Sequence, residues 1–215
     1  MLKHIALLAS LFPILYAQSQ SSIIDVPDAP IPIRILKQSP ADTNTDLQVI
    51  CLFRSSPQNT LHGALIETNE KLNGLLDRIR KPELFRGDLG ETLLLVPPKR
   101  TPGARKLLLV GLGDSETFSP QRMQLVGEIL YSEAGRLGAP QPFFAPTIID
   151  GGVTQFTTGQ ISEEVIAGFL RAAAIEKLLY NTNVPSVTAL TYLAGPKFAA
   201  NTLEGIEKAI AASRK

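Results

Sequence analysis

The sequence predicts a three-layer α/β sandwich, in which one sheet lies between two layers of helices. Short apolar runs that suit buried strands alternate along most of the chain with longer segments of helical periodicity. The clearest run covers residues 106–114, KLLLVGLGD, where branched aliphatic residues lead directly into two glycines. A short, continuous apolar run suits a strand buried on both faces, as in a sheet covered by helices. The glycines let the chain turn at the carboxyl end of that strand, where open α/β sheets bind their ligands.

The first half of the chain supplies two predicted strands and one predicted helix. Residues 31–36 alternate enough for an edge strand, in which Pro32 is tolerated because an edge N–H is not needed for pairing. After a polar loop, residues 47–53 form a second apolar run and predict a buried strand. Residues 64–80 carry leucines at helical spacing with charges on the other face, and Pro82 ends this predicted helix.

The second half continues the alternation of strands and helices. Short apolar runs predict strands at residues 92–96, 106–110, 142–149 and 187–193. Apolar residues at helical spacing predict helices at residues 119–138, 162–179 and 198–213. Ser119 is the expected N-cap, and Pro120 is expected in the first turn, of the first of these helices.

The N-terminal residues have the pattern of an export signal. Lys3 and His4 give a short basic start, residues 5–16 are apolar, and the small residue Ala17 provides a cleavage site. The apolar stretch is shorter than the roughly 20 residues that a membrane span needs. We therefore expect residues 1–17 to be a signal peptide, the mature protein to be periplasmic or secreted, and no membrane segment to remain after cleavage.

The expected domain organisation follows from this signal. Residues 18–30 are polar and show no periodicity, so we interpret them as a leader. Residues 31–215 then form a single domain, which is long enough to bury a core. A buried N-terminal helix is the alternative to the signal peptide, but Pro13 interrupts it and a polar tract follows.

Charge and cysteine content exclude several functions. The chain has 21 Lys and Arg residues against 20 Asp and Glu residues, so no long-range attraction favours nucleic acid or an anionic membrane. Cys51 is the only cysteine and lies in the apolar run VICLF, where a thiol behaves as a small hydrophobic group. We expect Cys51 to be buried and unreactive.

The residues that catalysis or metal binding needs are sparse. His62 is the only histidine that remains after signal cleavage, and we expect it to lie in a solvated loop. Glu163 and Glu164 are adjacent at a predicted helix start, where acids complement the helix dipole. We assign no catalytic residue, no metal ligand and no cofactor to this chain.

Two glycine-containing loops follow predicted strands and are candidates for an anion or nucleotide site. Backbone N–H groups at such strand ends can bind phosphate, although glycines are also needed simply to form tight turns. Both interpretations stay open from the sequence. The candidate ligand-binding residues are Gly111, Gly113, Ser115, Gly151, Gly152 and Thr154.

Three segments in order resemble the N-terminal domain of the leucyl (cytosol) aminopeptidase family. They are DLQVICLF at 46–53, FRGDLGETLLLVPP at 85–98 and KLLLVGLGD at 106–114. The resemblance implies a macro-domain-like sandwich with a mixed, mostly parallel sheet. It also implies that residues 196–215 correspond to the linker helix that leads family members into their catalytic domain. The two glycine loops resemble the phosphate loops of macro domains, which bind ADP-ribose, but CLFRSS at 51–56 departs from that pattern.

The resemblance implies a non-catalytic role. In the family, the peptidase centre lies in a C-terminal domain that uses two divalent metals such as zinc or manganese, and its metal-ligand signature has no counterpart in this sequence. We expect an exported relative of the accessory domain that acts in protein association or regulation. The partner would be a second copy or a separate aminopeptidase catalytic chain. The alternatives are the accessory half of a split or truncated metallo-aminopeptidase and a binder of phosphate- or nucleotide-type ligands.

Overall fold

A computed structural model describes residues 22–56, 60–81, 83–97, 103–181 and 184–214. The signal-peptide prediction therefore lies outside the described residues. The described chain forms a seven-stranded sheet in the order β1-β2-β7-β6-β3-β5-β4. The strands are β1 (Ile23–Asp25), β2 (Ile33–Leu36), β3 (Leu47–Leu52), β4 (Thr92–Leu95), β5 (Lys106–Gly111), β6 (Phe143–Ala145) and β7 (Leu190–Leu193).

The sheet is mixed and mostly parallel, which confirms the predicted fold class. The five strands from β2 to β5 in the sheet order pair in parallel, whereas β1 and β4 are antiparallel edge strands. The carboxyl ends of the parallel strands therefore meet at one edge of the sheet. We call this edge the carboxyl edge, and it is where ligands bind in open α/β sheets.

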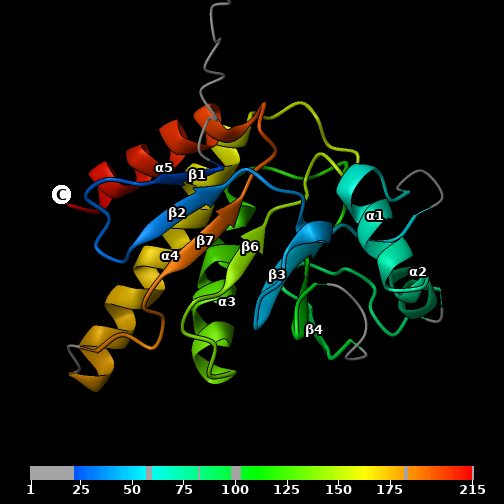
Figure 1. Cartoon of the computed structure of the whole chain (residues 1–215), viewed down its shortest axis with the longest axis horizontal. Helices are drawn as coiled ribbons and strands as arrows, with labels where there is room; N and C mark the ends of the chain where they lie inside the picture. Colours follow the sequence, from blue (N-terminus) through cyan, green and yellow to red (C-terminus); the bar gives the residue numbers. More distant parts are fainter. Residues whose placement is uncertain (1–21, 57–59, 82, 98–102, 182–183, 215) are drawn as a thin grey trace, which may run out of the picture.

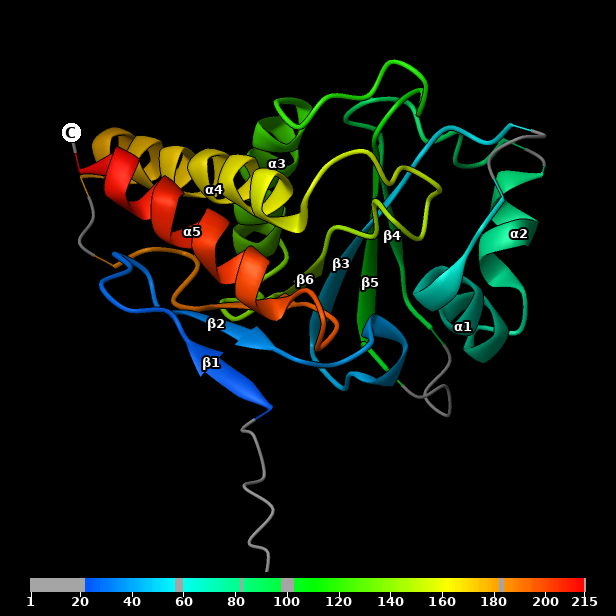
Figure 2. The same cartoon turned by 90° about the horizontal axis from the view of Figure 1, so that it is seen from above.

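Helices cover both faces of the sheet (Figures 1 and 2). The helices are α1 (Gly63–Lys71), α2 (Leu75–Arg80), α3 (Arg122–Arg136), α4 (Thr158–Tyr180) and α5 (Ala199–Ser213), with a short 3₁₀ turn η1 at Pro40–Asp42. Figure 2 shows α3, α4 and α5 on one side and α1 with α2 on the other, beside β3, β5 and β4.

Strand β3 shows how the core is divided between these two layers. All six of its residues are buried. Val49 and Cys51 belong to the apolar cluster that includes residues of α3, α4 and α5, and Ile50 and Leu52 belong to the cluster that includes residues of α1 and α2. Successive side chains of a strand point to opposite faces, so a strand between two helical layers is apolar throughout.

The N-terminal boundary of the domain differs from the prediction. Residues 18–30 were expected to be a leader, but Ile23–Asp25 forms β1 and pairs antiparallel with β2. Residues 31–36 were expected to form an edge strand, and β2 is instead covered on that side by β1. A three-residue strand with Ile23 40% exposed gives no periodic apolar signal in the sequence.

The predicted helix at 64–80 is broken into α1 and α2. Asn73 has φ 54° and Gly74 has φ 73°, so both adopt the left-handed conformation that ends a helix. Leu72 and Leu76 on either side of the break are still buried, which is why the apolar spacing continues through it. The sequence pattern alone therefore reads as one helix.

Helix α4 begins four residues earlier than predicted because it has its own capping box. Thr157 accepts a hydrogen bond from the Gln160 backbone N–H, and the Gln160 side chain accepts one from the Thr157 backbone N–H. The helix then runs 23 residues and lies between α3 and α5. A Cβ atom at Gly168 would lie 1.9 Å from the carbonyl oxygen of Gln124 on α3, so these two backbones are in direct contact.

Candidate functional site

The first glycine loop lies at the carboxyl end of β5 and packs against the turn at residues 87–91. The Gly111 N–H donates to the Glu91 carbonyl at 2.7 Å, and the Gly113 N–H donates to the Gly87 carbonyl at 2.8 Å. A Cβ atom at Gly111 would lie 2.0 Å from the carbonyl oxygen of Asp88. The two hydrogen bonds thus hold the glycine loop against this turn, and the close approach is possible because Gly111 has no side chain. Ser115 follows the loop and is partly buried.

The second glycine loop follows β6 and is also bonded internally. The Gly151 N–H donates to the Thr147 carbonyl and the Gly152 N–H donates to the Ile149 carbonyl, each at 3.0 Å. A Cβ atom at Gly151 would lie 2.6 Å from the Phe53 ring. Thr154 is exposed.

Aromatic rings pack where the two glycine loops approach each other. The ring of Phe118, which follows the first loop, lies 5.2 Å from the ring of Phe53 and 5.7 Å from the ring of Phe156 in edge-to-face arrangements. Phe53 also contacts Gly151, as described above. The structure therefore brings the loops to one edge of the sheet, and the glycines have clear packing roles there. Ligand binding by these six residues stays a prediction.

A cavity of about 320 Å³ opens at the carboxyl edge beside the second loop, next to the ends of β6 and β7. We call it the edge cavity. The six predicted residues are not among those that line it, but Asp150, the neighbour of Gly151, is. The other walls come from η1 and the two residues before it, from α1, from Phe156 and the N-terminal part of α4, and from residues within 192–202.

Thr147 fixes the loop that forms one wall of the edge cavity. Its φ is 49°, and its hydroxyl donates to the Cys51 carbonyl at 2.6 Å and accepts from the Cys51 N–H at 3.0 Å. The hydroxyl thus continues the pairing of β3 with the chain after β6. Asp150, three residues later, accepts from the Ala64 N–H at 3.0 Å and so caps α1. The N-cap residue His62 makes no side-chain capping bond of its own. Burial raises the pKa of the Asp150 carboxyl.

The remaining chemical candidates have structural roles. His62 is exposed beside Thr60. The interpretation of Glu163 and Glu164 as first-turn acids is wrong, because α4 begins earlier and its first turn contains no acid. Glu164 instead accepts hydrogen bonds from Gln124 at 2.5 Å and Gln121 at 3.4 Å, and so links α4 to α3.

Cys51 is fully buried, as predicted, and burial raises the pKa of its thiol far above the usual range. Across the described part of the chain, His, Cys, Asp and Glu form no group of three or more that could hold a metal ion. Within the same described residues, no helix has the length and apolar character needed to cross a bilayer.

The last turns of α4 expose a group of apolar side chains, which we call the apolar tip: Ile175, Leu178, Leu179 and Tyr180. Their exposed fractions lie between 47% and 82%. Ile175, Leu178 and Leu179 are spaced i, i+3 and i+4 and therefore share one side of the helix. Figure 1 shows this end of α4 at the lower left, beyond the strands. A second cavity of about 670 Å³ lies on the adjoining surface between α4 and α5.

Comparison with known proteins places the chain in a family. Residues 49–163 match the family described as cytosol aminopeptidase family, N-terminal domain. The chain belongs to this family. A probable cytosol aminopeptidase from Thermosynechococcus vestitus is 32% identical over 95 residues, which are 44% of this chain and 19% of that protein. One from Alkaliphilus metalliredigens is 31% identical over 96 residues, or 45% of this chain and 19% of its own. The matched region thus spans about a fifth of the length of these curated relatives.

Solved structures share the fold of this cytosol aminopeptidase relative. A mutant of tomato leucine aminopeptidase superposes with a TM-score of 0.58 and 23% identity, covering 81% of this chain and 35% of that one. A macrodomain mutant from Oceanobacillus iheyensis superposes with a TM-score of 0.58 and 12% identity, covering 89% of this chain and 100% of that one. The macro-domain-like fold is therefore confirmed.

The residues of the edge cavity were missed by the sequence analysis. Glu67, Asp150 and Tyr192 line it, and they come from α1, from the loop after β6 and from β7. They form no motif because they lie far apart in the chain. The only usable signal was the position of Asp150 directly after a predicted strand, at the edge where ligands bind.

Proposed function

We propose that this protein is an exported, non-catalytic accessory module of the cytosol aminopeptidase type, which acts by binding another polypeptide through the apolar tip of α4. The observation that carries the proposal is the exposure of Ile175, Leu178 and Leu179 on one side of α4, at 47%, 82% and 69% respectively. Large apolar side chains gathered on one surface mark interaction sites, whereas single exposed ones need no explanation. Export is proposed from the signal pattern of residues 1–17.

Contacts between α4 and its neighbouring helices indicate that the exposed apolar tip is an ordered surface, which favours a role in binding. Helix α4 is in backbone contact with α3 at Gly168, and closer to the tip the Tyr131 hydroxyl of α3 donates to Glu176. The tip is therefore presented on a helix that its neighbours hold in place. Rigid presentation lowers the entropy cost of association, and a few anchor residues then supply most of the binding free energy.

The proposed partner is an aminopeptidase catalytic chain. The curated relatives carry the matched region as about a fifth of a longer polypeptide named as a probable aminopeptidase. A domain of this family therefore occurs beside the rest of such an enzyme, and a non-covalent version of that contact needs an apolar surface of this kind. A second copy of this chain is the other outcome that the experiment distinguishes.

The test measures association by sedimentation velocity, with the chain alone and with an exported aminopeptidase catalytic chain of the same family and organism. Leu178→Lys places a charge at the most exposed tip residue and is expected to weaken association at least tenfold. Leu84→Lys is the matched control, because Leu84 is 67% exposed but lies in the loop after α2.

Association with the catalytic chain that Leu178→Lys weakens and Leu84→Lys spares supports the proposal. Self-association with the same dependence would move the partner assignment to a second copy. The proposal fails if neither complex forms at micromolar concentration, or if the two variants behave alike. A leucine-anilide assay with manganese checks the non-catalytic part, since turnover by this chain alone would contradict it.

A further inference from the structure

We propose that the edge cavity is a binding site for a small apolar amine, a ligand with an apolar body and one ammonium group. Glu67 and Asp150 would contact the ammonium group, and the apolar wall would contact the body. This site lies at the other end of α4 from the apolar tip and does not depend on the proposed association.

The cavity has the size and composition of a small-molecule site. Its volume of about 320 Å³ lies at the lower end of the range for ligand pockets. Apolar residues from three parts of the chain form most of its wall, among them Ile148, Phe156, Ile161 and Phe198. The parallel strands place it at the carboxyl edge, which is the usual ligand position in this class of sheet. An apolar wall of this kind selects an apolar ligand body.

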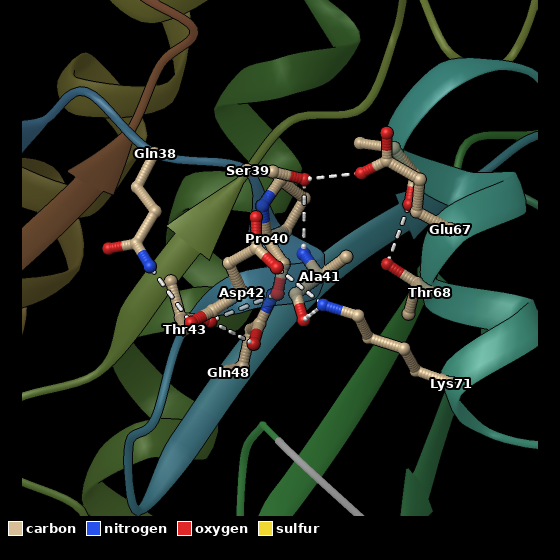
Figure 3. A network of polar contacts seen from close by, with 11 residues as sticks. Gln38, Ser39, Pro40, Ala41, Asp42, Thr43, Gln48, Glu67, Thr68 and Lys71 are labelled. Carbon is tan, nitrogen blue, oxygen red and sulfur yellow. Dashed lines mark hydrogen bonds and ion pairs between the residues drawn. The ribbon is translucent and has the colours of Figure 1, made fainter.

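The ionisable groups of the lining determine the charge of the ligand. Among the described lining residues, the carboxylates of Glu67 and Asp150 are present and no Lys, Arg or His is. The Glu67 carboxylate accepts one bond, from the Ser39 hydroxyl at 3.0 Å (Figure 3). Asp150 uses Oδ1 to accept from the Ala64 N–H. Each carboxylate thus keeps an oxygen that can accept from an ammonium group, and together they repel phosphate and carboxylate ligands.

The lysines near the cavity do not reverse its preference for a positively charged ligand. Lys71 on α1 is engaged by Asp42 and the Ala41 carbonyl (Figure 3), which directs it away from Glu67. Lys197 stacks over the ring of Phe198 at 4.7 Å and is the cation nearest in sequence to the cavity wall. Glu67 is exposed and Asp150 is partly buried, and among the described lining residues these two acids carry the only formal charges.

Tyr192 is a second, independent sign of a ligand. It lines the cavity, is only 1% exposed, and its ring packs edge-to-face on Phe144 at 5.4 Å. Its hydroxyl has no hydrogen-bond partner among the described residues. A buried hydroxyl without a partner is unfavourable, and a water or ligand bound beside it is one explanation for such a group. The hydroxyl oxygen is closed off from solvent, so a ligand ammonium or an accompanying water would reach it only after a shift of the Tyr192 ring.

The experiment compares ligands with one ring and different charges by isothermal titration calorimetry. The probes are 2-phenylethylamine, 2-phenylethanol and 3-phenylpropionate, with phenylalaninamide to separate a peptide-type ammonium group from a simple amine. We expect the two ammonium compounds to bind at least tenfold more tightly than the alcohol, and the acid not to bind. The amide binding more tightly than the simple amine would identify peptide N-termini as the source, and the reverse would identify free amines.

Three variants localise the effect. Glu67→Gln keeps the acceptor for Ser39 but removes the charge, and is expected to weaken amine binding about threefold to fivefold, as for a solvent-accessible ion pair. Glu70→Gln is the matched control, because it removes the same charge from the same helix outside the cavity. Tyr192→Phe is expected to weaken binding without lowering the melting temperature.

The proposal is overturned if the acid binds as well as the amine, if no probe binds at millimolar concentration, or if Glu70→Gln weakens binding as much as Glu67→Gln. Leu178→Lys at the apolar tip should bind the amine as the unaltered chain does. The amine site and the proposed association can therefore fail separately.

Discussion

The contact between α3 and α4 at Gly168 gives the sharpest test of the structure. In an ordinary helix interior, replacing glycine by alanine stabilises a protein by about 1 kcal/mol, because glycine loses more backbone entropy on folding. At Gly168 the added Cβ atom would lie 1.9 Å from the Gln124 carbonyl oxygen and 2.7 Å from its carbonyl carbon. Neither atom can move without shifting the backbone of α3. Gly168→Ala must therefore separate two helices.

The expected loss of stability in Gly168→Ala follows from two opposing contributions. Overpacking a core costs about 1–3 kcal/mol, and a clash with backbone belongs at the upper end of that range. Subtracting the gain of about 1 kcal/mol in helix propensity leaves a net loss of about 2 kcal/mol. For a domain of this size, such a loss lowers the melting temperature by about 4–8 °C.

Urea unfolding followed by circular dichroism measures this change. Ala174→Gly is the control, because Ala174 is exposed on the same helix, and it should cost only about 1 kcal/mol through propensity alone. An increase in stability for Gly168→Ala, as propensity alone would predict, would show that α3 and α4 do not approach as closely as described.

Two further predictions concern the hydrogen bond between Tyr131 and Glu176 and the buried thiol of Cys51. The Tyr131 hydroxyl donates to the Glu176 carboxylate. Partial burial of Glu176 opposes its ionisation, but the hydrogen bonds from Tyr131 and Ser186 have the larger combined effect and lower the pKa of Glu176 below 4.5. A carboxyl whose pKa is lower in the folded state than in the unfolded state stabilises the fold at any pH above its unfolded-state pKa. This stabilisation is lost as the pH falls through the folded-state pKa. Tyr131→Phe should therefore cost about 1 kcal/mol at neutral pH, and the difference from the unaltered chain should narrow in urea titrations below about pH 4. Cys51, with its pKa raised by burial, should react with iodoacetamide only at the rate of unfolding; rapid labelling of the folded protein would contradict the burial.

The sequence predicted the fold well wherever the physical signal is local. Strands β3 and β5 are short apolar runs because helices cover both faces, and α5 follows its apolar spacing to within one residue at its start. The break at Asn73 and Gly74 was missed because burial of Leu72 and Leu76 keeps the helical spacing intact across it. Backbone conformation at two residues decides that break, and spacing cannot show it.

The candidate site was harder to predict, for a different reason. Glycines are visible in a sequence, but Gly111 and Gly151 are explained by the backbone and the ring that fill the space beside them. The side chains that line the edge cavity are brought together only by the order of the strands. That order places β7 beside β6 and the β6 loop beside α1, and no spacing rule connects Glu67 with Tyr192.

Helix α4 carries both proposed surfaces and keeps them apart. Ile161 lines the edge cavity and Leu178 lies in the apolar tip, and 17 residues of helix separate them. At 1.5 Å per residue this is about 25 Å, so a small amine in the cavity cannot touch a partner bound at the tip. Coupling would require α4 to shift, and its backbone contacts at Gly168 and Gly205 oppose any shift. We therefore expect the amine to leave association through the tip unchanged within error, and a change above threefold would show that α4 moves between its neighbours.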